Sequence, residues 1–338
     1  MKPALFWKPK ANKTVQCNLC PRFCKINPNQ YGVCRARKNV NGKLYSAVYG
    51  KMASYNIDPI EKKPFFHFAP GSNVFSFSTT GCNLKCAFCQ NWDISMASEP
   101  KGQDVSPEKI VDIAKAQGIQ GIAYTYTEPT IFYEYALDTM KLAKKEGMYN
   151  VWVSNGYTNP EPIRKASKYL DAVNVDMKGD MKFYQKLCGV PNEEPVRKAL
   201  LEYKRRKVWI EITNLIIPGH NDRPEQIKRL VTWIKKNLGI ETPVHFTGFH
   251  PSYKLANIKP TPVKTLEKAY KTARELGMHW VYVGNVPGHR YESTYCWKCG
   301  DLVIRRIGYE LGKWYERCPN CGHKPLIEGR RWKGITEV

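Results

Sequence analysis

Residues 81–89 read GCNLKCAFC, which places three cysteines on one short stretch, with three and then two residues between them. They are Cys82, Cys86 and Cys89, and the aromatic Phe88 stands directly before the last of them. Three thiolates on one loop can bind three irons of a cubane 4Fe-4S cluster and leave the fourth iron open. The alternative is a zinc ion that is held by the three cysteines and completed by a ligand elsewhere in the chain.

The sequence from residue 73 to 285 alternates short β-branched or aromatic runs with amphipathic helical runs. This alternation is typical of βα units around a parallel sheet. One helix is predicted over 106–118 and another over 261–277, because each begins at a Ser-Pro or Thr-Pro pair and ends at glycine. The predicted strands are 73–80, 121–127, 149–155, 172–178, 208–217, 244–250 and 280–285.

Six or seven such units predict an α/β fold with a partial (β/α)6-type barrel instead of a closed eight-fold one. The cysteine stretch directly follows the first predicted strand, and barrels of this kind carry their active sites at that end of the strands. A reactive, open iron site is therefore favoured over a structural zinc site. We expect three parts: an N-terminal cysteine-cluster segment over 1–72, the partial barrel over 73–290, and a zinc-ribbon-like module over 291–338.

Near the C-terminus, two further cysteine pairs each enclose two residues, and eighteen residues separate the pairs. Each pair is followed by a glycine, Gly300 or Gly322, which suits a tight turn at a metal-binding knuckle. The pattern is typical of a zinc ribbon; rubredoxin-type iron uses the same ligands, and zinc is favoured. The four cysteines are Cys296, Cys299, Cys318 and Cys321.

A third cysteine cluster lies near the N-terminus, and its spacing fits neither a zinc ribbon nor a bacterial ferredoxin run. Zinc and an auxiliary 4Fe-4S cluster are both open for this set. Cys188 stands alone in a helical stretch, 183–189, and is expected to be a buried small hydrophobe. The N-terminal cysteines are Cys17, Cys20, Cys24 and Cys34.

The 338-residue chain carries a formal net charge of +23. Such a charge favours nucleic acid, acidic proteins or anionic small molecules as partners, although lysine-rich helix faces are often only solvated. No apolar run reaches the length of a membrane span, and the apolar residues 4–7 are too few for a signal peptide. A cytoplasmic protein without a membrane partner is expected. The twelve cysteines are clustered instead of scattered, which indicates metal binding and not disulfides.

The cysteine spacing, with an aromatic residue before the last thiol, resembles the signature of the radical S-adenosylmethionine (SAM) superfamily. Five segments at successive predicted strand ends resemble the SAM-contacting segments of the pyruvate formate-lyase activating enzyme group. They are YTEP at 126–129, SNG at 154–156, DMK at 176–178, LIIPG at 215–219 and FHP at 249–251.

The flanking segments narrow this resemblance. The N-terminal run CNLCPRFC at 17–24, and GNVPGH at 284–289 leading into the first ribbon cysteine, look like radical SAM enzymes of the AmmeMemoRadiSam system. This resemblance extends over nearly the whole chain.

The resemblance implies that Cys82, Cys86 and Cys89 hold a 4Fe-4S cluster whose open iron binds SAM, with Phe88 among the residues around the cofactor. It also places Glu128 near the methionyl amine of SAM. A glutamate in front of a proline can equally cap a helix, because it complements the positive helix amino end.

The remaining SAM contacts are implied at three further strand ends. Ser154 and Asn155 offer hydroxyl and amide groups for the ribose or the methionyl carboxylate. Asp176 and Lys178 pair an acceptor with a cation, or form a salt-bridged rim. His250 resembles the ribose-side histidine of the family, although a lone histidine is more often structural.

The resemblance implies an enzyme that reductively cleaves SAM to a 5'-deoxyadenosyl radical, with ferredoxin or flavodoxin as a one-electron reductant. A protein or peptide substrate is favoured, entering a lateral opening whose walls are the aromatic helix 130–135 and the ribbon. The alternative is an RNA-modifying radical SAM enzyme, which the ribbon and the +23 charge support. A non-catalytic, metal-containing nucleic-acid-binding protein is the alternative of another class.

Overall fold

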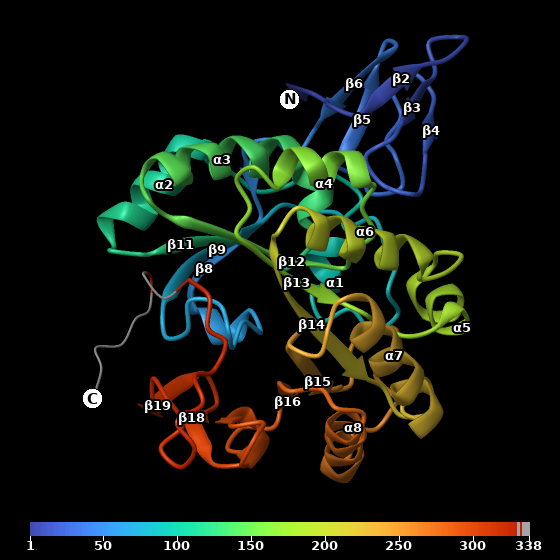
Figure 1. Cartoon of the computed structure of the whole chain (residues 1–338). Helices are drawn as coiled ribbons and strands as arrows, with labels where there is room; N and C mark the ends of the chain where they lie inside the picture. The colour runs from blue at the N-terminus through green and yellow to red at the C-terminus, as the bar shows by residue number, and fades with distance from the viewer. Residues whose placement is uncertain (330–331, 333–338) are drawn as a thin grey trace.

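A curved eight-stranded sheet forms the centre of the computed structural model, which describes residues 1–329 and 332 (Figure 1). Seven of its strands run parallel, and all seven predicted strands are present. The α/β partial barrel is therefore confirmed. The parallel strands are β9 (Asn73–Ser78), β11 (Gly121–Tyr124), β12 (Tyr149–Ser154), β13 (Ala172–Asp176), β14 (Trp209–Ile216), β15 (Val244–Gly248) and β16 (Val281–Gly284).

The eighth strand, β8 (Ser54–Pro59), pairs antiparallel with β9 at one edge of the sheet, so that Ser54 lies opposite Ser78. The sequence did not predict β8, because its SYNIDP run is polar and has exposed side chains at its middle. β8 comes from the segment that was expected to be a separate N-terminal part. The part boundaries at 72 and 290 stay predictions.

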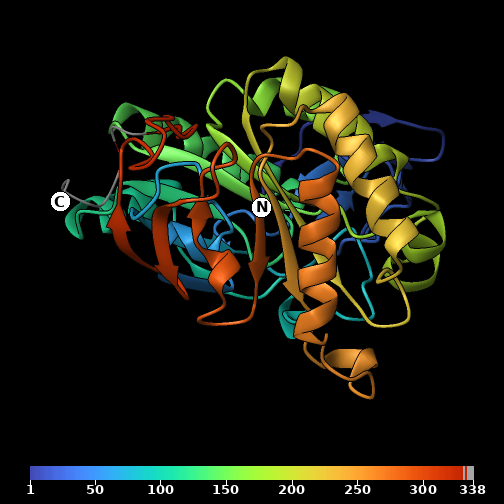
Figure 2. The same cartoon turned by 60° about the horizontal axis from the view of Figure 1, so that its bottom comes forward.

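Helices follow the strands in turn and cover the outer face of the sheet (Figures 1 and 2). Ser106 caps the first long helix by accepting a hydrogen bond from the backbone N–H of Lys109 at 3.2 Å, and Pro107 is the first helical residue, as the sequence predicts. The helices are α1 (Trp92–Ser95), α2 (Pro107–Ala116), α3 (Tyr133–Lys145), α4 (Pro160–Ala166), α5 (Met181–Phe183), α6 (Glu194–Arg205), α7 (Pro224–Asn237) and α8 (Val263–Glu275).

A plug, residues 60–69, fills the barrel near the N-terminal ends of its strands. Phe65 and Phe68 are buried there among side chains of β11, β12 and β13, and the Phe68 ring packs edge to face on Tyr149 of β12. The carboxylate of Glu211, near the start of β14, accepts a hydrogen bond from the backbone N–H of His67 at 2.8 Å. Because the plug occupies this end, the interior that remains lies toward the C-terminal ends of the strands.

The two terminal parts are small β structures on opposite sides of the sheet (Figure 1). The C-terminal one, the ribbon, is joined to the plug by Arg306, which donates to the backbone oxygen of Phe66 at 2.8 Å. The N-terminal part has two sheets made of β1 (Lys2–Pro3), β6 (Lys43–Ser46) and β5 (Arg37–Val40), and of β2 (Trp7–Pro9), β3 (Val15–Cys17) and β4 (Lys25–Ile26). The ribbon strands are β17 (Thr294–Tyr295), β18 (Leu302–Ile307) and β19 (Glu310–Trp314), and β7 (Lys51–Met52) pairs with β10 (Gln103–Asp104).

Within the described part of the chain, none of the helices has both the length and the apolar character needed to cross a membrane.

Candidate functional site

The cysteine stretch 81–89, which we call the cluster loop, begins directly beyond the C-terminal end of β9. Gly81 has a φ of +96°, and a Cβ at this position would lie 2.2 Å from the backbone oxygen of Cys34. Glycine is therefore required, both for its backbone conformation and for the close approach of the N-terminal part. The backbone N–H of Gly81 also donates to the oxygen of Ile94 at 2.9 Å.

Two distant segments hold the backbone of the cluster loop. Lys85 N–H donates to the oxygen of Cys188 at 2.9 Å, in the helical turn that follows α5. On the other side, Lys254 N–H donates to the oxygen of Ala87 at 2.9 Å, and Ser252 Oγ donates to the oxygen of Cys89 at 3.2 Å. The loop is thus fixed between the segments that follow β13 and β15.

The three thiols of the loop are buried or half-buried. A hydrogen bond with Cys188, together with burial, raises the pKa of the Cys86 thiol well above its ordinary value. Cys188 is fully buried, as predicted, but it also contacts the loop, which its sequence context does not indicate. Burial likewise raises the pKa of Cys82 and Cys89.

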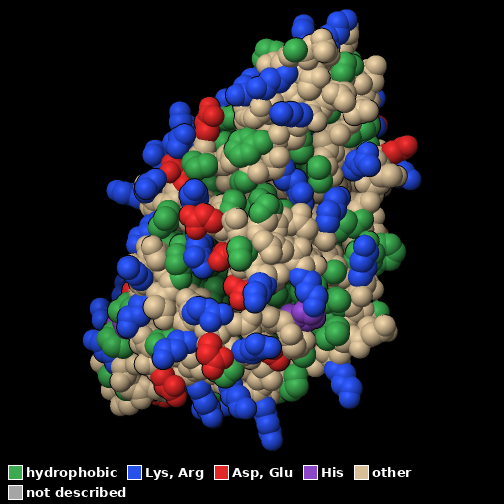
Figure 3. All heavy atoms as spheres, turned by 90° about the vertical axis from the view of Figure 1, so that its right-hand side faces the viewer, with side chains coloured by type: hydrophobic (Ala, Val, Ile, Leu, Met, Phe, Trp, Pro, Cys, Tyr) green, Lys and Arg blue, Asp and Glu red, His purple; other side chains and the backbone are tan. Residues whose placement is uncertain are grey.

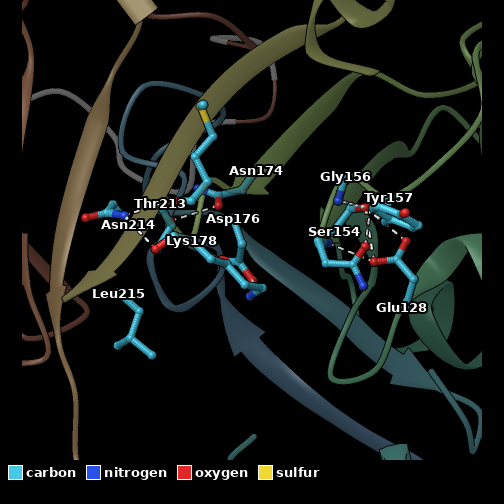
Figure 4. A network of polar contacts seen from close by, with 12 residues as sticks. Glu128, Ser154, Gly156, Tyr157, Asn174, Asp176, Lys178, Thr213, Asn214 and Leu215 are labelled. Carbon is cyan, nitrogen blue, oxygen red and sulfur yellow. Dashed lines mark hydrogen bonds and ion pairs between the residues drawn. The ribbon is translucent and has the colours of Figure 1, made fainter. Parts of the chain in front are cut away.

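Phe88 faces the end of β13. Its ring centroid lies 5.6 Å from that of Phe183, and the Nζ of Lys178 lies 5.6 Å from the Phe88 ring centroid. The same Nζ forms an ion pair with Asp176 at 2.7 Å (Figure 4). The sequence predicted either a pair of SAM contacts or a salt bridge for these two residues, and the salt bridge is present. The carboxylate of Asp176 is the more exposed partner.

Glu128 is fully buried and forms the centre of a polar network (Figure 4). It caps the short 3-10 helix η2 (Pro129–Phe132) by accepting a hydrogen bond from Thr130 N–H at 3.0 Å. Its carboxylate also accepts from Ser154 Oγ at 2.9 Å and from Asn155 N–H at 2.7 Å. The capping interpretation is thus present in the structure. A contact of Glu128 with a methionyl amine stays a prediction.

Asn155 joins this network to the cluster loop. Its side-chain amide nitrogen lies 2.9 Å from Asn83 Oδ1 and 3.7 Å from the sulfur of Cys82. The predicted residues Glu128, Ser154 and Asn155 are therefore brought together with the first thiol of the loop. Amide donors near cluster sulfurs are a usual way to tune such centres.

His250 is exposed and follows β15. Sequence reasoning missed an aromatic pair after the same strand: Tyr253 stacks on Trp92 of α1, with ring centroids 5.3 Å apart and an interplanar angle of 11°. Trp92 remains 47% exposed, three residues after Cys89. No spacing pattern links Trp92 to Tyr253, so only the folded chain shows this aromatic surface beside the cluster loop.

The prediction that the aromatic helix 130–135 forms a wall of the opening is wrong. Phe132, Tyr133 and Tyr135 are fully buried, and Tyr133 packs edge to face on Trp152 in the layer between sheet and helices. These rings are part of the hydrophobic core. Core packing alone explains why aromatic residues recur in this segment.

Polar side chains line the barrel interior toward the C-terminal ends of the strands. Their chemistry shows whether a ligand such as SAM fits there. Asp176 and Thr213 lie opposite each other on β13 and β14, and Thr213 donates to Asn174 at 2.8 Å (Figure 4). Ser78 shares the inward face of Val74 on β9, and its buried hydroxyl has no hydrogen-bond partner among the described residues. A polar ligand with hydroxyl and carboxylate groups fits this lining, and three thiols at its rim fit a cubane cluster.

The ribbon cysteines form a compact group whose four sulfurs lie within 4.8 Å of one another. Gly300 and Gly322 have positive φ angles, and their N–H groups donate to the oxygens of Cys296 and Cys318, at 2.8 and 2.9 Å. The predicted glycine turns are confirmed. Four thiolates complete a tetrahedral metal and leave no open position. The N-terminal cysteines, in contrast, line one cavity together with Asn83 of the cluster loop.

Comparison with known proteins gives one matching family model, described as the Radical SAM superfamily, over residues 76–234. The uncharacterized protein MJ0808 of Methanocaldococcus jannaschii is 44% identical over 331 residues, which cover 96% of this chain and 98% of that protein. The pyruvate formate-lyase-activating enzyme of Staphylococcus epidermidis is 26% identical over 226 residues, which cover 60% of this chain and 88% of the enzyme.

Solved structures share the fold at lower identity. A radical SAM methyltransferase from Sphaerobacter thermophilus has a TM-score of 0.51 and 14% identity, covering 63% of this chain and 66% of that one. SuiB of Streptococcus suis bound to S-adenosylmethionine also has a TM-score of 0.51 and 14% identity, covering 67% of this chain and 53% of that one. The names of these proteins do not identify the AmmeMemoRadiSam system, so that part of the resemblance stays a prediction.

Proposed function

The chain belongs to the radical SAM superfamily, and from this premise we propose that it is an enzyme that cleaves SAM reductively and thereby abstracts hydrogen from a protein or peptide substrate. The observation that carries the proposal is the position of the cluster loop. Its three thiols stand at the C-terminal end of β9, above a polar interior that the plug closes at the other end.

Cys82, Cys86 and Cys89 would hold the 4Fe-4S cluster, because they supply three thiolates and leave one iron without a protein ligand. When bound, the cluster supplies the electron that cleaves the sulfonium of SAM to methionine and a 5'-deoxyadenosyl radical. A one-electron reductant of the ferredoxin or flavodoxin class is the partner that this chemistry requires.

The protein's own residues bind and orient the cofactor. The hydroxyl of Ser78 can both donate to and accept from a ribose hydroxyl, and the exposed side of the Asp176 carboxylate can accept from one. Asn155 places an amide beside Cys82, and buried Glu128 fixes the backbone from which that amide projects. Glu128 is on this account a positioning residue. His250 stays a candidate contact at the exposed rim.

Two observations support a protein or peptide substrate. Relatives at 26% and 27% identity are named pyruvate formate-lyase-activating enzymes. Beside the cluster loop, exposed Trp92 stacks on half-buried Tyr253 and offers an aromatic surface of the kind that anchors peptide side chains. On the face shown in Figure 3, Lys and Arg side chains are spread among other groups and do not form one basic patch, which favours the solvated interpretation of the charge there.

The test is transfer of deuterium from labelled partners into 5'-deoxyadenosine. Anaerobic, reduced enzyme is incubated with the deuterated proteins that copurify with it and, separately, with deuterated total cellular RNA. Label is expected from the protein fraction only. Label from RNA alone would replace the proposal with an RNA-modifying enzyme, and label from neither, with SAM cleavage intact, would also exclude the protein assignment.

A further inference from the structure

The four N-terminal cysteines come together although they span a loop-rich segment. Cys17 lies in β3, and its N–H donates to the oxygen of Cys24 at 2.9 Å. Phe23 N–H donates to the oxygen of Cys20 at 3.2 Å, which closes a turn between these thiols. The cavity that all four cysteines share is lined otherwise by apolar side chains and by Arg22, Arg37 and Asn83.

The spacing of the thiols differs between this cavity and the ribbon. A tetrahedral zinc ion with Zn–S bonds of about 2.3 Å brings its sulfurs to roughly 3.8 Å from one another. The ribbon has this compactness, and it is the one such group of cysteine, histidine or acidic ligands among residues 1–329 and 332. Neither the N-terminal thiols nor the three thiols of the cluster loop form one.

The thiols of a cubane cluster are spread more widely than those around one zinc ion, because each binds a different iron. The cluster-loop thiols, which belong to a family built on such a cluster, likewise form no group within 4.8 Å among the described residues. We propose that Cys17, Cys20, Cys24 and Cys34 hold a second iron–sulfur cluster, in which all four irons have a protein ligand.

Arg37 gives independent support for a ligand in this cavity. Its side chain is 1% exposed, and its positive charge is paired with Glu134, whose carboxylate accepts from the terminal nitrogen Nη1 of Arg37 at 2.8 Å. Its buried Nε–H, in contrast, has no hydrogen-bond partner among the described residues, although Arg37 lines the thiol cavity. A buried donor without a partner is costly, and the sulfur atoms of an anionic cluster would accept from it.

The cavity shares a wall with the cluster loop. Asn83, one residue after Cys82, lines the cavity, and the oxygen of Cys34 lies against Gly81. Arg22, which also lines the cavity, donates to the backbone oxygen of Asn83 at 2.5 Å. A fully ligated cluster has no iron open to SAM, so its chemistry is the uptake and release of single electrons. Its place next to the cluster loop suits that role.

The deciding experiment removes the loop ligands and counts what remains. The variant Cys82→Ala/Cys86→Ala/Cys89→Ala is prepared anaerobically, and its iron, acid-labile sulfide and zinc are measured. About four irons and four sulfides with one zinc per chain are expected, and dithionite should produce a paramagnetic signal of a reduced cluster. Adding Cys20→Ser and Cys24→Ser should remove the iron and leave the zinc.

Two zinc ions and no iron in the loop variant would overturn the proposal. Where that variant fails to fold, the unaltered chain decides instead: about eight irons support the second cluster, and about four irons with two zincs contradict it. The loop variant has no reactive cluster in any case, so a failure of the proposed SAM chemistry does not affect this count.

Discussion

The backbone N–H of Asn155 donates to the buried carboxylate of Glu128 at 2.7 Å, while the side-chain amide of Asn155 reaches the sulfur of Cys82. One residue, Asn155, thus connects the loop after β11 to the loop that carries the first thiol. Ser154 and Thr130 also donate to this carboxylate, so that side-chain hydroxyls and the backbone N–H groups of Thr130 and Asn155 converge on it.

Replacing Glu128 by Gln should disturb this connection. Gln keeps the shape of the side chain but replaces one acceptor oxygen by an NH2 group. This donor would face the N–H groups that now donate to the carboxylate, and we expect the mismatch to lower the free energy of unfolding by roughly 1.5–3 kcal/mol. We expect KM for SAM to rise about tenfold, with a smaller change in kcat, because Asn155 is displaced. Glu161→Gln, at an exposed position, is the matched control. An unchanged KM in a folded Glu128→Gln protein would contradict the positioning role.

Gly81→Ala should destabilise the fold around the cluster loop by several kcal/mol, because its Cβ would meet the Cys34 oxygen at 2.2 Å and its φ is +96°. Gly118 provides the control: its φ is +65°, but a Cβ there meets nothing within 4 Å, so Gly118→Ala should cost only about 1 kcal/mol. Urea unfolding of both apoproteins measures the difference. Equal losses in the free energy of unfolding would show that the N-terminal part does not pack closely against Gly81.

The ribbon should be structural. Cys318→Ser removes one ligand of a closed four-thiol site, so the protein should lose about one zinc per chain and become less soluble. SAM cleavage without substrate should persist, because the cluster loop contacts other segments. Metal analysis and cleavage assays on the same preparation test both points. Loss of loop-bound iron in this variant would argue against a separate ribbon.

Glu61 should make stability depend on pH. Burial raises its pKa to about 7 from 4.5, and one of its oxygens has no hydrogen-bond partner among the described residues. The folded protein therefore keeps a proton that the unfolded chain has lost, so the stabilising effect is complete below pH 4.5 and disappears as the pH rises through 7.

Glu61→Gln should remove this loss. At pH 8 the variant should be more stable than the unaltered protein by roughly 3 kcal/mol, and near pH 5 the difference should be small. Unfolding by urea at the two pH values is the measurement, with the exposed Glu99→Gln as control. The same difference at both pH values would mean that Glu61 is not protonated in the fold.

Local patterns predicted the seven parallel strands and the ribbon turns, because β-branched runs and glycines act through the backbone next to them. The edge strand β8 was missed, since its polar run becomes a strand only by pairing with β9. The aromatic residues 130–135 were misassigned, because their spacing does not say which layer covers them. The contact of Cys188 with the cluster loop, and the stack of Trp92 on Tyr253, depend on segments far apart in sequence and could not be predicted.

Reductive cleavage of SAM by two cysteine variants tests the central claim most directly. Cys188 lies within hydrogen-bond reach of Cys86, so it could replace that ligand, and the informative comparison is Cys188→Ala against Cys86→Ala/Cys188→Ala. After anaerobic reconstitution and reduction, Cys188→Ala should release 5'-deoxyadenosine like the unaltered chain, because all three loop thiols remain. The double variant should release none, since only Cys82 and Cys89 are left to hold the cluster. Undiminished release by the double variant would contradict the assignment of the cluster loop as the reactive centre.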